Sequence, residues 1–138
     1  MKIKQLSIFL ENKTGRLSHI VNALGNANIN IRAISLADTS DFGILRMIVD
    51  DTEQAKQRLH DIGFTLSVTD VIAVEVQDKP GEFGQILAIV EQAGLNVEYV
   101  YGPISTKGEN AILILRFEDV DKAIEILTSH GIKVFTND

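Results

Sequence analysis

The chain has 138 residues, of which 45% are hydrophobic and 23% are charged, a composition that is typical of a folded globular protein and excludes a disordered one. Its 13 lysines and arginines stand against 19 aspartates and glutamates, and the net charge of −6 argues against nucleic acid as a partner. The lack of cysteine excludes disulfides, a thiol nucleophile and cysteine-ligated metal sites. The N-terminal apolar segment is too short and too interrupted for a signal peptide or a membrane span, so we expect a cytoplasmic protein with no membrane partner.

The first predicted element is a strand over residues 5–10, where apolar and polar side chains alternate so that one face is buried. A helix follows Gly15, because apolar residues recur there at the spacing of one helical face. Two β-branched runs, residues 29–31 and 43–49, predict strands on either side of the turn at residues 37–43. The apolar face of the predicted helix consists of Leu17, Ile20, Val21, Leu24 and Ala27.

A second helix is predicted to begin after Asp51, whose side chain suits the N-cap position, with Gln54 three residues later as in a capping box. Gly63 is expected to end this helix. Residues 64–69 alternate again and predict a fourth strand. The buried face of the second helix is expected to consist of Ala55, Leu59 and Ile62.

The chain then repeats this pattern. Gly15 aligns with Gly81 at an offset of 66 residues, and beyond the middle of the copy the offset is 68, so that Gly63 aligns with Gly131. Two registers that differ by one loop-sized insertion indicate a duplication.

We therefore expect two domains, residues 1–69 and residues 70–138. Each domain contains strand, helix, strand, strand, helix and strand, which predicts an α+β, ferredoxin-like βαββαβ unit with an antiparallel sheet and both helices on one face. Since no linker separates the copies, we expect the two units to form a rigid pair.

The loop between the first strand and the first helix follows the same pattern in both copies. It contains a polar residue, Asn12 or Asp78, and a helix-opening glycine, Gly15 or Gly81. Glycine lets a ligand approach the backbone, and the N–H groups of the first helical turn lack helical partners and attract a carboxylate. The loop suits a zwitterion such as a free amino acid, although the same pattern also occurs in ordinary turns and helix caps.

Asn30 and Asn96 occupy the start of the second strand in the two copies. If the first and second strands are neighbours, these side chains lie beside the loop and add a polar group to the ligand site. They are equally compatible with a role in starting a strand after a turn.

The segments ENKTGRLSHIVNALGNANINI and QDKPGEFGQILAIVEQAGLNV resemble the opening of ACT domains, which have the form N-x-P-G-x-L, a helix and then G-x-N-I. The resemblance covers essentially the whole chain as two tandem ACT domains. It implies pairing of domains side by side through strands or helices, and amino acid effectors held at a domain interface. The ligand-binding residues that it implies are Asn12, Gly15, Arg16, Leu17 and Asn30 in the first copy and Asp78, Gly81, Glu82, Phe83 and Asn96 in the second.

The chain departs from the family pattern at three places. Thr14 stands where proline is usual, and Leu10 and Val76 stand where serine-binding members carry histidine, so serine recognition of that type is not expected. Asp78 replaces asparagine, and its carboxylate would repel an effector carboxylate but could hold its ammonium group. We expect the two loops to differ in affinity or to serve opposite ends of one ligand.

The sequence contains no arrangement of residues that predicts a catalytic site. His19, His60 and His130 have no mutual metal-ligand spacing, and the carboxylates cluster at helix starts, where caps and helix dipoles favour them. No pair is placed as general acid and base, and no nucleophile turn is present. We expect no catalytic residue, no metal and no cofactor.

Tyr99 and Tyr101 alternate on a predicted strand, which places both rings on one face of the sheet. Packing in a core or an interface is the favoured interpretation, and a place in the effector pocket is the alternative. The following loop, residues 102–110, is a candidate cover for that pocket.

Together with the resemblance to ACT domains, the sequence predicts a non-catalytic regulatory protein that binds a free amino acid at the loop and helix-start sites between domains and forms a homodimer. The alternative is a regulatory subunit of an amino acid biosynthetic enzyme such as acetolactate synthase, with that metabolic enzyme as partner. A structural module whose loops bind nothing and a small ferredoxin-like hydrolase are the remaining hypotheses.

Overall fold

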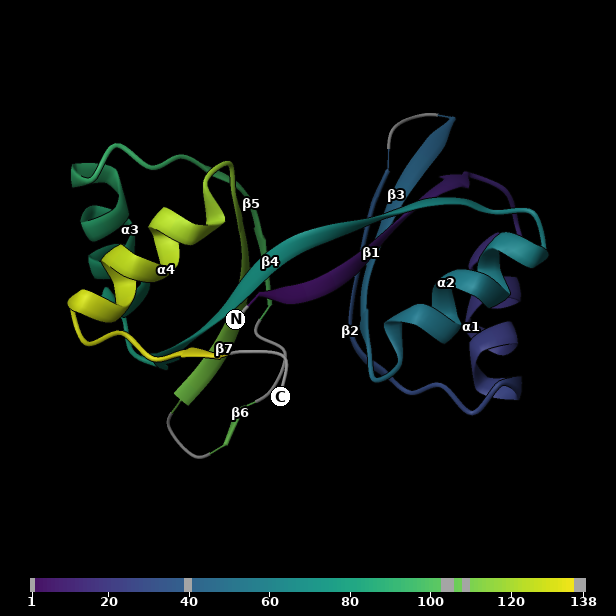
Figure 1. Cartoon of the computed structure of the whole chain (residues 1–138), viewed down its shortest axis with the longest axis horizontal. Helices are drawn as coiled ribbons and strands as arrows, with labels where there is room; N and C mark the ends of the chain where they lie inside the picture. Colours follow the sequence, from purple (N-terminus) through teal and green to yellow (C-terminus); the bar gives the residue numbers. More distant parts are fainter. Residues whose placement is uncertain (1, 39–40, 103–105, 108–109, 136–138) are drawn as a thin grey trace. The chain divides into compact units, whose positions relative to one another are not determined.

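The computed structural model describes residues 2–38, 41–102, 106–107 and 110–135. The chain divides into two compact units (Figure 1): an N-terminal unit, Lys4–Thr69, and a C-terminal unit that begins at Asp70. Lys2 and Ile3 belong to the C-terminal unit, whereas the sequence assigns them to the first domain.

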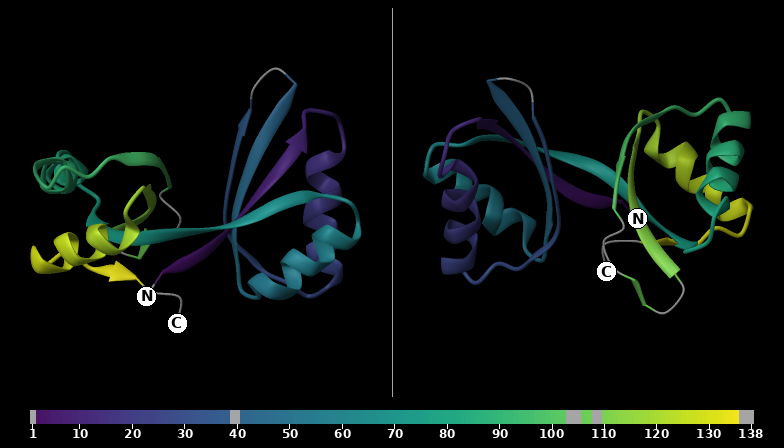
Figure 2. Two further views of the ribbon diagram at one scale, coloured as in Figure 1. Left: turned by 45° about the horizontal axis from the view of Figure 1, so that its top comes forward. Right: turned by 180° about the vertical axis from the view of Figure 1, so that it is seen from behind.

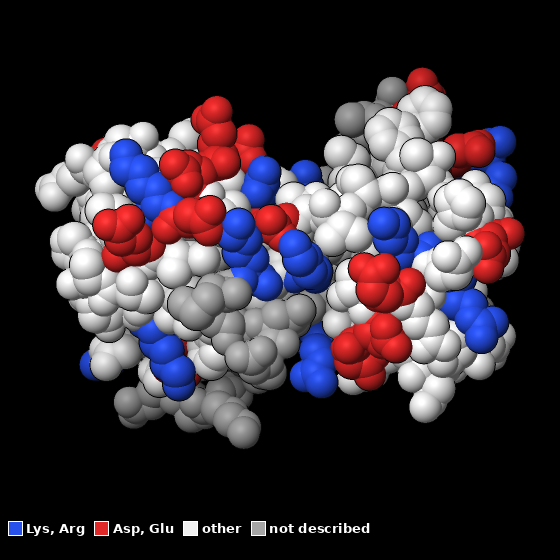
Figure 3. Space-filling model, in the orientation of Figure 1, with Lys and Arg blue, Asp and Glu red and all other residues white. Residues whose placement is uncertain are grey.

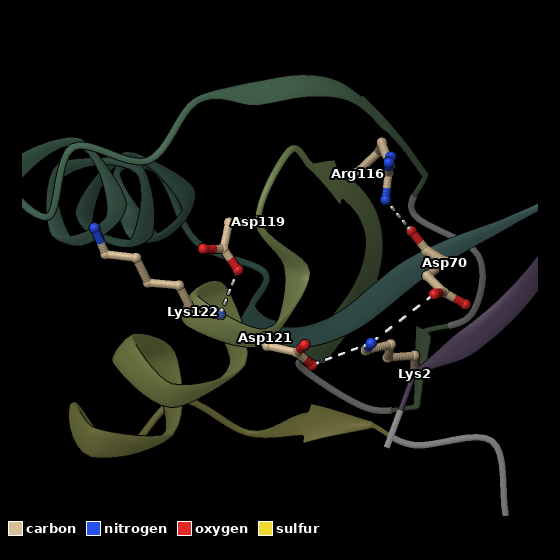
Figure 4. A network of polar contacts seen from close by, with 6 residues as sticks. All are labelled: Lys2, Asp70, Arg116, Asp119, Asp121 and Lys122. Carbon is tan, nitrogen blue, oxygen red and sulfur yellow. Dashed lines mark hydrogen bonds and ion pairs between the residues drawn. The ribbon is translucent and has the colours of Figure 1, made fainter.

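Ion pairs link the start of the chain to the C-terminal unit. Lys2 Nζ lies 3.2 Å from Asp121 Oδ1 and 4.0 Å from Asp70 Oδ2. Figure 4 shows the Lys2 side chain pointing toward both carboxylates. In the same network, Arg116 Nη1 donates to the backbone carbonyl of Asp70 at 2.8 Å. Ion pairs and a hydrogen bond thus connect the start of the chain with three further segments of this unit, those that contain Asp70, Arg116 and Asp121.

The N-terminal unit has the predicted order of elements. Its sheet runs β2-β3-β1-β4, and β3 pairs antiparallel with both β1 and β2. This strand order confirms the ferredoxin-like prediction. The elements of the described part of this unit are β1 (Ile3–Glu11) from Lys4 onward, α1 (Arg16–Asn26), β2 (Ile31–Asp38), β3 (Phe42–Val49), α2 (Thr52–Asp61) and β4 (Thr65–Gln77) as far as Thr69.

The C-terminal unit repeats this topology with β4 as its first strand. Its sheet runs β8-β4-β7-β5, and the short β6 pairs with β7. Strand β4 crosses the boundary after Thr69 without interruption, as the absence of a linker predicts. The further elements of this unit within the described residues are α3 (Glu82–Gln92), β5 (Val97–Tyr101), β6 (Thr106–Lys107), β7 (Asn110–Phe117), α4 (Val120–Ser129) and β8 (Val134–Phe135).

In each unit the two helices cover one face of the sheet (Figure 2), and the core lies between helices and sheet. Apolar burial at that interface is the main stabilising contribution. In the N-terminal unit the core includes Leu6, Ile8, Ile20, Leu24, Leu45, Met47, Ala55 and Leu59. In the C-terminal unit it includes Ile72, Val74, Ile86, Val90, Leu115, Phe117, Ala123 and Leu127.

Local signals set the ends of α2 and α4. Asp51 Oδ1 accepts a hydrogen bond from Gln54 N at 3.1 Å, which confirms the predicted N-cap. At the equivalent position of the second copy, Asp119 Oδ1 accepts one from Lys122 N at 3.0 Å (Figure 4). Gly63, with φ of +96°, follows the end of α2 as predicted. The burial predicted for Ile62 is wrong: it stands at the C-cap of α2 and is 42% exposed.

Candidate functional site

The start of α1 is built as the sequence predicts. Gly15 is the N-cap residue with φ of +89°, and no side chain forms a capping hydrogen bond there. The hydroxyl of Ser18 donates to the Gly15 carbonyl at 3.2 Å, so it does not satisfy a helix N–H group. A β-carbon on Gly15 would meet nothing within 4 Å, which leaves the backbone open to a ligand.

Two N–H groups in the first turn of α1 remain available. The Arg16 N–H donates to the Lys13 carbonyl at 3.2 Å within the turn, so it is not one of them. The first hydrogen bond of the helix is made by His19 N to the Gly15 carbonyl. Among the described residues, the N–H groups of Leu17 and Ser18 have no hydrogen-bond partner, and such groups attract an anion.

A hollow of about 280 Å³ lies beside this helix start. It brings together Asn12, Arg16 and Leu17, three of the five residues proposed for the first copy, and one wall is apolar. We call it the loop hollow. Its lining consists of Leu10, Glu11, Asn12, Lys13, Thr14, Arg16, Leu17, Leu36 and Gly43.

The charged groups around the loop hollow favour an anion. Lys13 Nζ lies 3.0 Å from Glu11 Oε2, and Arg16 Nη2 lies 3.8 Å from Glu11 Oε1. A hydrogen bond and the charge of Lys13, together with the charge of Arg16, hold the pKa of Glu11 below its ordinary value. Glu11 is therefore ionised at neutral pH, and two cations and one anion leave this loop with a charge of about +1.

The second loop has the same backbone but the opposite charge. Gly81 has φ of +89° without a side-chain cap, and Glu82 N donates to the Lys79 carbonyl at 3.3 Å. Asp78 and Glu82 replace the asparagine and arginine of the first loop, so with Lys79 its charge is about −1. The backbone of the helix start is thus the same in both units, but the first loop favours an anion and the second disfavours one.

The residues proposed for the second copy are less closely grouped. Phe83 packs against the hydrophobic core of its unit, and Asp78 is exposed. A hollow of about 400 Å³ in this unit is lined by Glu82, but Asp78 and Phe83 are not among its described lining residues.

The expectation that Asn30 lies beside the loop is wrong within a unit. Asn12 N donates to the Asp41 carbonyl, just before β3 begins, whereas Asp50 N donates to the Asn30 carbonyl, just after β3 ends. Asn12 and Asn30 therefore lie at opposite ends of β3, which has 8 residues and is roughly 26 Å long at about 3.3 Å per residue. The reason is topological, because β3 lies between β1 and β2 and the α1 crossover returns the chain to the start of β1.

Asn96 is separated from the second loop in the same way. Gln77, which precedes Asp78, pairs with Asn110 at the start of β7, and Val97, which follows Asn96, pairs with Phe117 at its end. Neither second-strand asparagine can reach the loop of its own unit.

Strand β2 forms the edge of the N-terminal sheet and carries exposed apolar side chains. It pairs with β3, and the sheet order ends at β2. Ile34 is 46% exposed and Leu36 is 48% exposed, and both pair with β3 residues of the buried face. Leu17 of α1 is 36% exposed, although its helical spacing predicts burial. Leu36 and Leu17 both line the loop hollow, so this edge and the hollow are continuous.

The tyrosine pair lies on one face of the sheet, as predicted. Tyr99 and Tyr101 stack with ring centroids 6.5 Å apart and an angle of 22° between the ring planes. Their partners Arg116 and Ile114 alternate with the core residues of β7, so the rings lie on the face away from the helices. The proposed cover, residues 102–110, lies largely outside the described residues, and within it the structure describes the short strand β6.

Other kinds of site were sought over the same part of the chain. The described residues contain no group of three or more histidine, aspartate or glutamate side chains placed to hold a metal ion. None of the helices in the described residues has the length and apolar composition needed to cross a membrane. On the face drawn in Figure 3, acidic and basic side chains are interspersed within each unit.

Fold and loop geometry together define a pair of ferredoxin-like units with ligand-compatible helix starts, and sequence comparison identifies the family. The model of the ACT domain pair matches residues 1–138, so the chain belongs to this family.

The chain is also similar to one curated protein and to two solved structures. The acetolactate synthase small subunit of Buchnera aphidicola is 34% identical over 77 residues, which cover 51% of this chain and 48% of that protein. A crystal structure of a protein from Bacteroides thetaiotaomicron is 37% identical, with a TM-score of 0.92 over 98% of this chain and 92% of its own. The regulatory subunit of aspartate kinase from Thermus thermophilus has a TM-score of 0.67 and 16% identity over 91% of each chain, which supports the fold.

Proposed function

We propose that this chain is a non-catalytic regulatory protein that binds a free amino acid at the loop hollow of its N-terminal unit. The observation that carries the proposal is the helix start at Gly15, where, within the described part of the chain, the Leu17 and Ser18 N–H groups have no hydrogen-bond partner. Leu17 lines the loop hollow, and the loop beside it has a charge of about +1. These N–H groups can donate hydrogen bonds to the carboxylate of the ligand. The side-chain amide of Asn12 can donate to that carboxylate or accept from the ammonium group of the ligand.

The size and lining of the loop hollow fit a ligand of this class. Its volume of about 280 Å³ is near the lower limit of small-molecule sites, at about 300 Å³. Leu10, Leu17 and Leu36 provide an apolar wall for a side chain. Two to four charge-assisted hydrogen bonds at about 1.5–3 kcal/mol each, less the ordering costs, correspond to micromolar to millimolar affinity, which suits a sensor of metabolite concentration.

A second copy of the chain would complete this site. If the β2 edges of two copies pair antiparallel, the start of one strand meets the end of the other, and Asn30 of the second copy arrives beside the loop hollow. Burial of Ile34 and Leu36 would stabilise the same contact. The proposed homodimer therefore supplies the polar group that a single unit places at the opposite end of β3.

The loop of the C-terminal unit is the weaker candidate. Asp78 and Glu82 repel a carboxylate there, and Gly81, Phe83 and Asn96 provide no compensating cation. We propose that this loop is empty at effector concentrations that fill the first one, or that it binds the ammonium end of a ligand.

A thermal-shift screen of the twenty amino acids tests the proposed function. At least one of them should raise the unfolding temperature, because a ligand bound to the folded state stabilises it. Asn12→Ala and Asn30→Ala should each weaken that ligand by about tenfold, the equivalent of one charge-assisted hydrogen bond. Asn22→Ala, an exposed asparagine on α1, is the matched control and should change nothing. If no amino acid raises the unfolding temperature at millimolar concentrations, the proposal is contradicted.

The second candidate is a regulatory subunit of an amino acid biosynthetic enzyme. The similarity to the acetolactate synthase small subunit favours it, although the match spans about half of that protein. Affinity purification of the tagged chain from its own cells should then retain a large catalytic chain, and purification of the chain alone would count against this candidate. A cytoplasmic location stays a prediction.

A further inference from the structure

A second hollow of about 260 Å³ in the N-terminal unit lies on the other side of Arg16. It is formed by the ends of β1 and β3, the first turns of α1 and the turn between α2 and β4. It shares Glu11 and Arg16 with the loop hollow, and its other lining residues are different. We call it the aromatic hollow.

Four rings line the aromatic hollow. The rings of Phe9 and Phe42 have centroids 5.4 Å apart, and those of His19 and Phe64 are 5.5 Å apart in an edge-to-face arrangement. Phe9 is 55% exposed and Phe42 is 45% exposed, so two large aromatic side chains remain in contact with solvent. Covering them would be favourable, and a planar ligand could stack against them.

A cation and an open stretch of backbone complete the lining. The Arg16 side chain is 41% exposed at the edge of the aromatic hollow, where its planar guanidinium can bind a carboxylate. Glu11 also lines this hollow; its Oε2 atom lies 3.0 Å from Lys13 Nζ and its Oε1 atom lies 3.8 Å from Arg16 Nη2, so Lys13 is its nearer cation and a ligand carboxylate would share Arg16 with it. At Gly63, with φ of +96°, a β-carbon would meet nothing within 4 Å, so a flat group can approach that turn.

The duplication provides an internal comparison. The hollow of about 400 Å³ in the C-terminal unit is lined by the equivalents of all the residues that line the aromatic hollow. There, Glu75 replaces Phe9, Asn110 replaces Phe42 and Glu82 replaces Arg16. The fold therefore forms the hollow in both units, while its aromatic and cationic character belongs to the N-terminal unit.

We propose that the aromatic hollow binds a small aromatic carboxylate, with its ring against Phe9, Phe42 and Phe64 and its carboxylate on the Arg16 guanidinium. The proposal does not rest on the proposed amino acid site, although the two hollows share Glu11 and Arg16. Because Arg16 lines both hollows, a carboxylate bound in one would lower the positive charge available to a carboxylate in the other.

Isothermal titration of the full chain with phenylacetate tests the proposal. Phenethylamine keeps the ring but reverses the charge, and cyclohexylacetate keeps the charge but lacks the aromatic ring. Phenylacetate should bind at least about tenfold more tightly than phenethylamine, because the amine would face Arg16, and more tightly than cyclohexylacetate. Binding of phenylacetate that is undetectable at millimolar concentrations would overturn the proposal.

Variants separate the two hollows. Phe42→Asn introduces the residue found at the equivalent position of the C-terminal hollow and should weaken the binding of phenylacetate by about tenfold. If this variant is unstable, Phe9→Gln tests a second exposed phenylalanine of the same hollow and should have the same effect. Leu36→Asn alters the loop hollow alone and should leave phenylacetate affinity unchanged. Loss of binding in Leu36→Asn with retention in Phe42→Asn and Phe9→Gln would place the ligand in the loop hollow and refute the proposal. If none of the twenty amino acids raises the unfolding temperature but phenylacetate still binds, the proposed function is refuted and the proposal for the aromatic hollow stands.

Discussion

At the scale of single residues, the backbone at Gly15 and Gly81 decides whether the two loops can form. Both have φ of +89°, a region that costs residues with a β-carbon about 1–2 kcal/mol. Because a β-carbon at either position would meet nothing within 4 Å, the cost of a substitution is conformational and not steric.

Gly15→Ala should therefore lower the free energy of unfolding by about 1–2 kcal/mol, measured by urea denaturation. Gly25→Ala is the matched control, since Gly25 lies within α1 and a β-carbon there also meets nothing within 4 Å. This control should raise stability by about 0.5–1 kcal/mol, because alanine favours the helix. Equal effects at the two positions would contradict the role of φ.

At the scale of elements, the repeated N-caps Asp51 and Asp119 fix the starts of α2 and α4. Each carboxylate accepts a backbone N–H three residues later, and each stands where the helix dipole favours a negative charge. The buried faces of these helices then contact the sheet through Ala55 and Leu59 or Ala123 and Leu127.

Asp51→Ala and Asp119→Ala should each cost about 1 kcal/mol of stability, because each leaves a helix N–H without its partner. Chemical denaturation followed by circular dichroism measures the change. Glu118→Ala, at the exposed neighbouring position, should stay within about 0.5 kcal/mol of the unmodified chain. A loss of similar size in Glu118→Ala would indicate a general charge effect instead of capping.

At the scale of the whole molecule, the β2 edge is where the proposed dimer contact adjoins the proposed ligand site, since Leu36 of β2 lines the loop hollow. An exposed apolar edge strand tends to pair with another strand. In the proposed homodimer this pairing brings Asn30 to the loop hollow of the other copy, so a ligand that bridges the two would strengthen assembly.

Ile34→Lys should therefore weaken the dimer by at least about tenfold in analytical ultracentrifugation, because it removes apolar burial and places like charges near the twofold axis. Ile62→Lys is the matched control, since Ile62 is 42% exposed against 46% for Ile34 and lies in the turn after α2. A monomeric unmodified chain, or equal weakening by both variants, would contradict assembly through β2.

Much of the site was predictable from the sequence because its signals are local. The glycine that opens each helix, the caps at Asp51 and Asp119 and the two-residue alternation of the strands each depend on a few neighbouring residues. Burial was less predictable at the margins of these elements. Leu17 and Ile62 continue apolar patterns but are exposed, since the apolar spacing extends past the area that the sheet covers.

By itself, the sequence determined the duplication, the order of elements in each unit, the fold class and the loop on which the proposed amino acid site rests. Tertiary structure alone decided which strand ends meet, and it placed Asn30 at the far end of β3 from Asn12. It also revealed the aromatic hollow, whose rings come from β1, α1, β3 and the turn before β4. Periodicity and capping record contacts within a few residues, whereas strand order and the lining of a hollow depend on segments that come together only when the sheet forms.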